Sequence, residues 1–513
     1  MGLIKAFSVE EVRDAVWLCD GSKSPGPDGF NLFFVKEGWE IFKDEIVEAL
    51  ALFHETGCIP KGCNASFVAL VPKVRDPAKL EQYRPISLVG VMYKVISKVL
   101  AERIEKVLPS VIDKCQSAFL KERGILDSVL AANEVIEDLR RRRMSGLCFK
   151  VDFEKAYDSV SWEFLYDMLR RLGFHSRWIM WIKGCLASAS VSVLVNGSPT
   201  EEFYPSRGLR QGDRLAPFLF LVVAEGLTGI VRQAAKANLY DSLNIGRTEV
   251  GLCMLQFADD TLFLCQDAFS NVFTLKAILR GFEVASGLKI NFHKSKLAGI
   301  NVCKSNMDCY TKTLNCSQME VPFTYLGIEV GGNPRKKFWE SVLKKLKSRL
   351  SVWKGRFLSM AGRLCLIKSV LSAIPLYYLS LFKAPEVVCK SIISIQRSFL
   401  RGWGKEKRSV AWVKWKDLCQ PNGEGGLGIR DIRKFNHALL ANWKWRCISE
   451  GKGRWREFIL SKYGTDPSGA DVPVKYQSWW WRDLKKVCRE GGGEGWFQEQ
   501  LGWKVGRGDK VRF

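Results

Sequence analysis

Several features that mark other classes of protein are absent from this chain of 513 residues. No two of its 16 cysteines form a C-x-x-C pair, and there are only four histidines, which argues against a zinc site. No apolar run approaches the ~20 residues of a membrane-spanning helix, and the best one, Leu215–Ala224, ends at Glu225. The N-terminus lacks the apolar stretch of a signal peptide, and Ala6 stands where a myristoylation motif has Ser or Thr. We therefore expect an intracellular protein with reduced thiols and no membrane-spanning segment.

Acidic residues are scarce relative to basic ones, with 54 Asp and Glu against 78 Lys and Arg and a formal net charge of +24. The imbalance is concentrated between Arg335 and Lys416, where 20 basic residues stand against 3 acidic ones. A strongly basic surface favours a polyanionic partner, either nucleic acid or an anionic membrane surface. The composition, with 47% hydrophobic and 26% charged residues, is that of a globular protein, and the length predicts about three packed units.

Hydrophobic periodicity and turn residues predict a mixture of helices and short strands. Ser8 and Glu11 have capping-box spacing, which predicts a first helix over 8–19. Further helices are predicted over Trp39–His54, Lys94–Leu108, Ile125–Arg141, Trp162–Leu172, Pro217–Ala235, Asn271–Ala285 (with Gly287 as its C-cap), Phe338–Trp353 and Ala361–Leu381. Strands are predicted over Val68–Pro72, Cys148–Phe153, Val191–Val195, Gly251–Phe257 and Tyr325–Val330. From residue 401 on, the chain is rich in Trp and Gly and shows only weak periodicity.

The run Arg140–Arg143 has two interpretations. Cations interact favourably with the dipole at the C-terminal end of a helix, so the run is consistent with a solvated helix end. The alternative is a patch for nuclear import or for nucleic-acid binding.

Two acidic strand ends carry the most informative pattern in the chain. The segment LQFADDTLFL places Asp259 and Asp260 between two β-prone runs, which is typical of a hairpin turn. Adjacent carboxylates repel each other unless a cation compensates them, although a solvated turn with two aspartates is also common. The segment VDFEKAYDSV puts Asp152 at the end of another β-prone run. Carboxylates on neighbouring strands can hold two divalent ions that position a triphosphate and a 3′-hydroxyl, and Mg²⁺ suits such a site.

These segments belong to a series of motifs that resembles the reverse transcriptase of LINE-type (non-LTR) retrotransposons, of a plant-like lineage. The series covers roughly residues 1–400 and runs in order through SKSPGPDGF, YRPISL, QSAFL, VDFEKAYDSV, GLRQGD, FADD, SGLKINFHKSK and YLGI. The resemblance implies an α+β fold of the right-hand polymerase type, with fingers, a palm built on an antiparallel sheet, and a helical thumb. It also implies four divisions: an N-terminal extension over 1–60, fingers and palm over 61–332, a basic thumb over 333–400, and an incomplete Trp- and Gly-rich segment over 401–513.

By this resemblance, Asp152, Asp259 and Asp260 match the catalytic carboxylates, which bind two Mg²⁺ ions, with Mn²⁺ as a substitute. Asp152 and Asp259 are implied as the main ligands and Asp260 as their support. Tyr157 matches the aromatic steric gate, whose ring lies under the incoming sugar and excludes a 2′-OH. The alternative for Tyr157 is a core aromatic on a helix.

Five other positions match residues that contact the nucleotide. Gln211 and Gly212 match the loop that supports the templating base, where a glycine lets the backbone approach closely. Arg84 matches a fingers arginine that reaches the triphosphate, or else it is a structural surface arginine. Arg123 is a weaker candidate for the same work. Lys294 matches a lysine proposed to protonate the pyrophosphate leaving group.

The residues from Tyr325 onward match the parts of a reverse transcriptase that hold the nucleic acid, namely the primer grip and the thumb. The residues that match the primer grip are Tyr325, Leu326, Gly327 and Ile328, for which an ordinary edge strand is the alternative. The thumb residues expected to face the core are Phe338, Trp339, Leu346, Leu350 and Trp353. Those expected to face the template–primer duplex are Lys344, Lys345, Lys347, Arg349, Lys354 and Arg356. Contacts of this kind go to phosphates and depend strongly on salt, whereas a merely solvated lysine face is the alternative.

Three positions depart from the family pattern: Arg214 replaces a usual Pro, Met254 a frequent His, and Glu122 the glycine of a usual K-G-R. None of them removes a metal ligand, but Arg214 and Glu122 are expected near the nucleotide and can lower activity. The chain begins just before the polymerase motifs and ends at Phe513 in mid-pattern. We therefore expect a fragment or degenerate copy that lacks the endonuclease and the C-terminal zinc and ribonuclease H segments.

The leading hypothesis is an RNA-directed DNA polymerase that copies an RNA template from a DNA primer with dNTPs. A nicked chromosomal end would serve as primer, which predicts action in the nucleus and no membrane partner. The alternative is a catalytically decayed fragment that only binds nucleic acid. A third interpretation, an RNA-templated RNA polymerase or intron maturase, is disfavoured by Tyr157.

Overall fold

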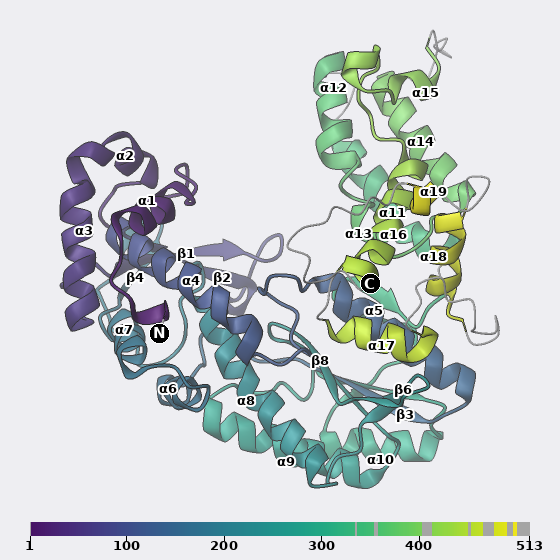
Figure 1. Cartoon of the computed structure of the whole chain (residues 1–513), viewed down its shortest axis with the longest axis horizontal. Helices are drawn as coiled ribbons and strands as arrows, with labels where there is room; N and C mark the ends of the chain where they lie inside the picture. Colours follow the sequence, from purple (N-terminus) through teal and green to yellow (C-terminus); the bar gives the residue numbers. More distant parts are fainter. Residues whose placement is uncertain are drawn as a thin grey trace, which may run out of the picture. The chain divides into compact units, whose positions relative to one another are not determined.

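The computed structural model describes residues 2–333, 336–352, 358–402, 413–449, 453–464, 477–489 and 496–499. The chain divides into two compact units. The first consists of Met1–Ser128, Ser145–Leu243 and Gly251–Met319, and the second of Val129–Met144, Asn244–Val250 and Glu320–Phe513. Figure 1 shows both units and labels many of their helices and strands. All 16 cysteines are free thiols, as expected.

Three helices open the first unit: α1 (Val9–Trp17), α2 (Leu32–Glu37) and α3 (Trp39–Thr56). The predicted cap of α1 is confirmed, because Ser8 Oγ accepts a hydrogen bond from the Glu11 N–H at 3.2 Å. The Glu11 side chain does not complete a capping box. It forms an ion pair of 2.6 Å with Arg103, a buried residue of α4 (Val91–Val111), and so fixes α1 against α4.

A four-stranded sheet in the first unit has the order β2-β1-β4-β5. Its strands are β1 (Ala65–Pro72), β2 (Tyr83–Val89), β4 (Ser190–Val195) and β5 (Ser198–Pro199). β1 pairs antiparallel with β2 and parallel with β4. The helices α6 (Trp162–Arg171) and α7 (Ser176–Ala187) contribute large buried side chains, among them Trp178 and Trp181.

A second sheet in the first unit has five strands in the order β11-β10-β3-β9-β8. Its strands are β3 (Gly146–Val151), β8 (Met254–Phe257), β9 (Asp260–Cys265), β10 (Lys296–Ile300) and β11 (Ser317–Gln318). β3 lies in the middle and runs antiparallel to both β9 and β10. Nearly every residue of β3 and β9 is buried, so both faces of these strands are covered. This arrangement brings the end of β3 beside the β8–β9 hairpin.

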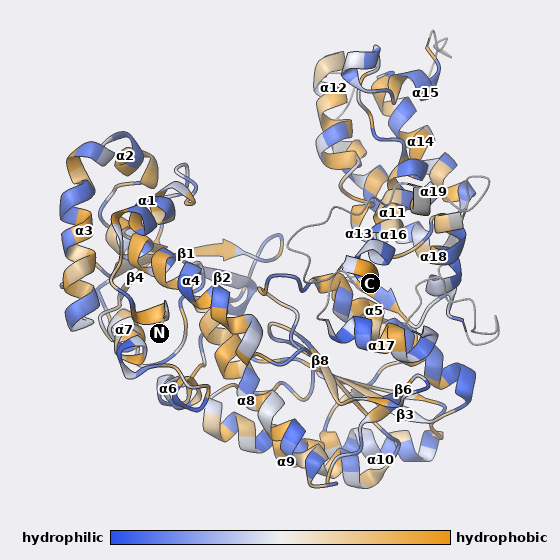
Figure 2. Cartoon of the chain, viewed as in Figure 1, coloured by the Kyte–Doolittle hydropathy of each residue, from blue (hydrophilic) through white to orange (hydrophobic). Residues whose placement is uncertain are grey.

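The helices α8 (Ala216–Lys236), α9 (Phe269–Ser286) and α10 (Lys304–Leu314) pack one beside the next in this unit (Figure 1). The predicted end of α9 is confirmed, since Gly287 is its C-cap with a left-handed φ of 78°. Figure 2 shows hydrophobic and hydrophilic bands that alternate along α3 and α9. That alternation is typical of helices with one face in the core.

Helix α8 is longer than the apolar run in the sequence suggests. The run ends at Glu225, yet this glutamate is itself only 5% exposed and accepts a hydrogen bond from the Asp113 N–H at 2.9 Å. Within the described ranges, α8 is the one helix with the length and mean hydropathy of a membrane span. Because 61% of its most apolar 18-residue window is buried inside the protein, α8 has the surroundings of a core helix.

Glu225 gives the first unit a pH-dependent stability. Burial raises its pKa to about 7 against the opposing effects of the Asp113 N–H, Arg232 and Arg123. The native state therefore keeps a proton that the unfolded chain has lost, and the stability from this group falls as pH rises from about 4.5 to about 7. We expect Glu225→Gln to be more stable than the wild type by about 3 kcal/mol at pH 8, and this advantage to vanish near pH 4.5. Urea unfolding across this pH range measures the difference.

The matched control for this prediction is Glu48→Gln, which changes an exposed glutamate of α3. Its effect on unfolding should be small, because a substitution on the surface away from packed contacts changes stability little. A stability difference between Glu225→Gln and the wild type that stays constant from pH 4.5 to pH 8 would contradict the prediction.

The second unit is mostly helical. It contains α5 (Ile125–Arg142) from Val129 onward, and two hairpins that draw on β6 (Leu243–Ile245), β7 (Val250–Leu252), β12 (Phe323–Tyr325) and β13 (Ile328–Val330). Its other helices are α11 (Lys336–Val352), α12 (Met360–Leu366), the π-helix η4 (Ile367–Leu371), α13 (Leu376–Leu379), α14 (Glu386–Leu400), α15 (Trp415–Leu418), α16 (Ile432–Ser449), α17 (Arg454–Tyr463), α18 (Trp479–Arg489) and α19 (Trp496–Glu499).

The helical stretch predicted over Ala361–Leu381, which contains Pro375, is divided in the structure into α12, η4 and α13. Pro375 has no backbone N–H and stands immediately before α13. The weak periodicity beyond residue 401 concealed α16, α17 and α18. Tryptophans of these helices pack edge to face, with ring centroids 5.1 Å apart for Trp443 and Trp455 and 5.8 Å apart for Trp443 and Trp480. The apolar side chains of these helices therefore do not follow the single narrow stripe that makes a helix visible in a sequence.

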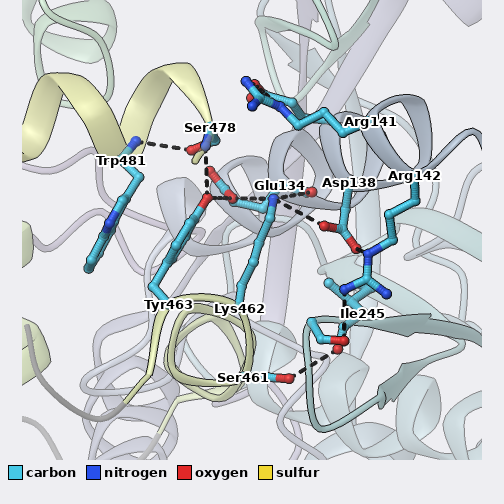
Figure 3. Close-up of polar contacts among 12 residues, drawn as sticks. Glu134, Asp138, Arg141, Arg142, Ile245, Ser461, Lys462, Tyr463, Ser478 and Trp481 are labelled. Carbon is cyan, nitrogen blue, oxygen red and sulfur yellow. Dashed lines mark hydrogen bonds and ion pairs between the residues drawn. The ribbon is translucent and has the colours of Figure 1, made fainter. Parts of the chain in front are cut away.

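A buried polar cluster joins α5, α17 and the start of α18 (Figure 3). The Lys462 ammonium donates to the Glu134 carboxylate at 2.8 Å, and the Tyr463 hydroxyl donates to the same oxygen at 2.7 Å. The Ser478 N–H donates to the Tyr463 hydroxyl at 3.1 Å. The Tyr463 ring stacks on Trp481 with centroids 4.3 Å apart. These contacts make the C-terminal helices an integral part of the second unit.

The arginine run at the end of α5 is engaged within the protein. Arg141 forms an ion pair with Glu137, and Arg142 with Asp138, each one turn earlier on the same helix. Arg140 donates to backbone carbonyl oxygens of the second unit. These contacts favour the interpretation of the run as a helix end.

Candidate active site

Asp152, Asp259 and Asp260 come together at one end of the five-stranded sheet. Val151, the last residue of β3, pairs with Thr261 of β9, and the antiparallel register therefore places Asp152 opposite Asp260. The turn between β8 and β9 carries Asp259. The predicted hairpin with paired carboxylates is thus confirmed, and β3 supplies the third acid.

The pKa values of Asp259 and Asp260 are both raised, and the charge of Asp152 contributes to each shift. Asp259 reaches solvent, but the protein around it is the largest cause of its raised pKa, and the charges of Asp260 and Asp152 raise it further. The pKa of Asp260 is also raised by burial and by Asp152, against a lowering effect of Lys150. A bound cation would remove this repulsion, since opposite charge favours the ionised form of each acid.

The donor set at this end of the sheet fits a hard divalent cation. It consists of carboxylate oxygens, which Mg²⁺ and Mn²⁺ prefer. Among the described residues, no three Asp, Glu, His or Cys side chains already converge into a metal-binding group. Mg²⁺ keeps several waters and takes substrate phosphates as ligands, so a few carboxylates at the ends of neighbouring strands suffice for it.

The backbone of Asp152 is fixed by a turn that follows in sequence much later. The Asp152 N–H donates to Ser295 Oγ at 3.1 Å, and the Asn291 N–H donates to the Asp152 carbonyl at 2.8 Å. Lys294 lies in the same turn and its side chain is exposed. Reasoning from the sequence missed Asn291 and Ser295, although their place in the SGLKINFHKSK motif was a signal.

Tyr157 lies beside the carboxylates. Its half-buried ring stacks on Phe220 of α8 with centroids 4.8 Å apart and an interplanar angle of 16°. Burial is the largest cause that raises the pKa of Tyr157, and the charge of Asp259 adds to it. The ring therefore has a fixed orientation and a neutral hydroxyl next to Asp259, and both features are compatible with the predicted gate.

The loop with Gln211 and Gly212 connects the Tyr157 turn to β2. The Leu209 N–H donates to the Tyr157 carbonyl at 2.7 Å, and the Ser87 N–H of β2 donates to the Gln211 carbonyl at 2.7 Å. Gly212 has a φ of +105°, and a Cβ there would come within 3.0 Å of the Ser87 carbonyl oxygen. A glycine is therefore required for this close approach.

The two arginines expected to reach the triphosphate differ in their surroundings. Arg84 is exposed on β2, three residues before Ser87. Arg123 is half-buried and donates to four backbone carbonyl oxygens at the end of α4 and in the following loop, at 2.5 to 3.2 Å. These contacts favour a structural role for Arg123 over the predicted contact with nucleotide. Its neighbour Glu122 has a φ of 66°, which the family's usual glycine adopts without strain.

The predicted primer-grip residues form a tight hairpin in the second unit. Instead of the single strand expected over Tyr325–Val330, β12 ends at Tyr325 and β13 begins at Ile328. Leu326 and Gly327 make the turn with φ of 48° and 81°. The Leu326 carbonyl oxygen accepts a hydrogen bond from the Tyr377 hydroxyl at 2.8 Å. The hairpin is thereby fixed to α13.

Helix α11 has the two faces that the sequence predicts. The residues expected in the core are buried, namely Phe338, Trp339, Leu346 and Leu350. The four cations expected on the outside are exposed, namely Lys344, Lys345, Lys347 and Arg349. We call these four the α11 basic face. The remaining residues predicted for this segment lie outside the described ranges: Trp353, Lys354 and Arg356.

Comparison with known proteins matches the chain to one protein family and to relatives from mobile elements. Residues 71–330 match the family described as "Reverse transcriptase (RNA-dependent DNA polymerase)". The transposon TX1 uncharacterized 149 kDa protein of Xenopus laevis is 26% identical over 438 residues, which are 84% of this chain and 32% of that protein. The retrovirus-related Pol polyprotein from the type-2 retrotransposable element R2DM of Drosophila melanogaster is 24% identical, over 84% of this chain and 40% of the polyprotein.

The RNA-directed DNA polymerase from the mobile element jockey of Drosophila funebris is 23% identical to the chain, over 63% of the chain and 35% of that protein. The chain thus spans between about a third and two fifths of the length of these three relatives.

Proposed function

Since the chain belongs to the reverse transcriptase (RNA-dependent DNA polymerase) family, we propose that it is the RNA-directed DNA polymerase of a non-LTR retrotransposon. The observation that carries this proposal is the juxtaposition of Asp152, Asp259 and Asp260 within the matched region. The substrates would be an RNA template, a DNA primer and dNTPs. We propose the nucleus as the place of action, because a nicked chromosomal end would serve there as the primer.

In the proposed reaction, the primer 3′-hydroxyl loses its proton to water and its oxygen forms a bond to the α-phosphorus of a dNTP. The bond between the α-phosphorus and the oxygen that bridges to the β-phosphate breaks, and pyrophosphate leaves with that oxygen. Two Mg²⁺ ions, when bound, stabilise the attacking and the leaving oxygens. Asp152 and Asp259 would hold these ions, with Asp260 in support. Tyr157 would exclude a 2′-OH by its ring, which Phe220 orients.

Other residues of the chain would bind and orient the substrates. The exposed Arg84 would contact the triphosphate, for which its planar guanidinium is suited. The backbone of Gln211 and Gly212 would support the templating base. Lys294, in the turn that fixes Asp152, would donate a proton to the pyrophosphate. The hairpin turn at Leu326 and Gly327 would hold the primer end.

Primer extension on an RNA template with Mg²⁺ and dNTPs tests the proposal. Extension that depends on the template and on the divalent cation is the expected result. If the protein binds the template–primer duplex but adds no nucleotide, the proposal fails and the chain is a nucleic-acid-binding protein without polymerase activity.

The α11 basic face would contact the phosphates of the template–primer duplex. We expect replacement of all four of its cations by Gln to weaken duplex binding by about 10- to 100-fold at 100 mM salt. The plot of log affinity against log salt concentration should also become shallower by up to about 3.6, because each lost phosphate contact removes about 0.9 from the slope. Fluorescence anisotropy with a labelled RNA–DNA duplex at several salt concentrations measures both effects.

The control removes the same charge elsewhere on the chain. It replaces four exposed lysines of the first unit by Gln: Lys106, Lys236, Lys304 and Lys312. Binding that weakens equally in both variants would show that net charge alone matters, and would refute a specific role for the α11 basic face.

A further inference from the structure

A buried glutamine holds the turn that carries Asp259. Gln116 is 1% exposed, and its side-chain oxygen accepts hydrogen bonds from the Ala258 N–H at 2.9 Å and the Ala118 N–H at 3.0 Å. Its side-chain nitrogen donates to the Ala258 carbonyl at 3.4 Å. The two N–H donors fix which end of the amide is which, since only the oxygen can accept. Gln116 therefore binds both backbone polar groups of the residue that precedes Asp259.

The residue that Gln116 holds has an unfavourable backbone conformation. Ala258 has a φ of 54°, in the left-handed region that residues other than glycine rarely adopt. Such a conformation persists only where surrounding contacts impose it, and it occurs preferentially at functional sites. Without those contacts, the turn would relax and change the direction of the Asp259 side chain.

The segment around Gln116 is itself fixed to β8. Cys115 and Ser117 form backbone hydrogen bonds with Gln256, from the Gln256 N–H to the Cys115 carbonyl at 2.9 Å and from the Ser117 N–H to the Gln256 carbonyl at 3.0 Å. The Ser117 hydroxyl lies 2.6 Å from the Ser128 hydroxyl. Gln116 is thus presented to the turn from a rigid position, 142 residues away from Ala258 in sequence.

We propose that Gln116 is a positioning residue of the active site, which imposes the left-handed conformation of Ala258 and so orients the carboxylate of Asp259 for cation binding. The inference rests on the proposed polymerase function. Gln116 contacts neither substrate nor cation, and acts through the backbone on either side of Ala258. This gives a role to the first residue of the QSAFL motif, for which the sequence alone indicated none: it positions the turn that carries Asp259.

The test compares Gln116→Met, which removes every side-chain hydrogen bond at nearly constant volume, with the wild type. We expect kcat for nucleotide addition to fall by about 100-fold with a much smaller change in KM, because a misplaced catalytic group costs rate rather than ground-state binding. Binding of Mn²⁺ to the protein alone, followed by electron paramagnetic resonance, should weaken by about 10-fold. In the Gln116→Met background, Ala258→Gly should restore kcat by roughly tenfold, since glycine adopts this φ at no steric cost.

Gln256→Met is the matched control. Gln256 is equally buried, lies two residues before Ala258, and its side chain accepts a hydrogen bond from Thr228 of α8 instead of the turn. It should lose comparable stability in thermal denaturation while it keeps kcat and Mn²⁺ affinity. If Gln116→Met does not fold, Gln116→Asn, whose shorter amide cannot span both groups of Ala258, takes its place.

Two results would overturn the inference: equal effects of the Gln116 and Gln256 variants on kcat and Mn²⁺ affinity, or no recovery with Ala258→Gly. If the wild type adds no nucleotide at all, the proposed polymerase function fails. The Mn²⁺ affinities of the same variants then still decide whether Gln116 orients Asp259.

Discussion

Asp259→Asn is expected to lower the rate of primer extension by at least about 1,000-fold while affinity for the template–primer duplex stays unchanged. The size follows from the several kcal/mol by which a divalent cation stabilises the transition state, at about 1.4 kcal/mol for each tenfold in rate. Asn has nearly the same shape as Asp but no charge to hold the cation. Single-turnover extension on an RNA template, with duplex affinity measured in parallel, gives the two quantities.

The same substitution is expected to make the metal-free protein more stable to heat at neutral pH. The protein around Asp259 and the charges of Asp260 and Asp152 raise its pKa, so its ionised form destabilises the folded state. Removal of this charge abolishes the cost. A site that gains stability and loses activity on one substitution has been arranged for a cation at the expense of stability.

Asp308→Asn, in an exposed position on α10, is the control for both measurements. It should change neither the rate nor the thermal midpoint. If Asp259→Asn extended primers within tenfold of the wild type, Asp259 could not be a main ligand of the catalytic cation.

Features set by a few neighbouring residues could be predicted from the sequence. The Ser8 cap, the Gly287 C-cap and the two faces of α11 each depend on contacts within one helix or on its spacing of apolar residues. The β8–β9 turn with its paired aspartates is equally local. The α+β fold of the right-hand polymerase type is confirmed by the palm sheet, whose strands β10, β3, β9 and β8 are antiparallel, and by the family match, and the motif order predicted it.

Features set by contacts between distant segments could not be predicted in this way. Arg123 carries the charge of a nucleotide ligand, and only the position of the backbone carbonyls around it shows its structural role. Gln116 and Ser295 fix the active-site backbone through partners more than 100 residues away, and no periodicity reports such pairs. The hairpin at Leu326 was missed because its flanking residues are β-prone on both sides of a turn that only the backbone dihedrals reveal.

Lys462→Met is expected to reduce the free energy of unfolding of the second unit by about 3–5 kcal/mol. Lys462 and Glu134 are another pair of this kind, 328 residues apart, and their side chains are 4% and 2% exposed. Removal of the ammonium leaves the Glu134 carboxylate buried without its counter-ion, and loss of one partner of a buried pair costs this much. Urea unfolding followed by tryptophan fluorescence measures the loss, because Trp481 stacks on the neighbouring Tyr463.

The double variant Glu134→Gln, Lys462→Met separates the uncompensated charge from the lost packing. Gln keeps an oxygen that can accept from the Tyr463 hydroxyl but carries no charge, so the double variant should be more stable than Lys462→Met alone. Lys434→Met, which removes an exposed charge from α16, should be nearly neutral. If the double variant lost as much as the two single losses added together, the pair would contribute through packing alone. A double variant that lost less than this sum would show that charge compensation across this cluster joins the C-terminal helices to α5.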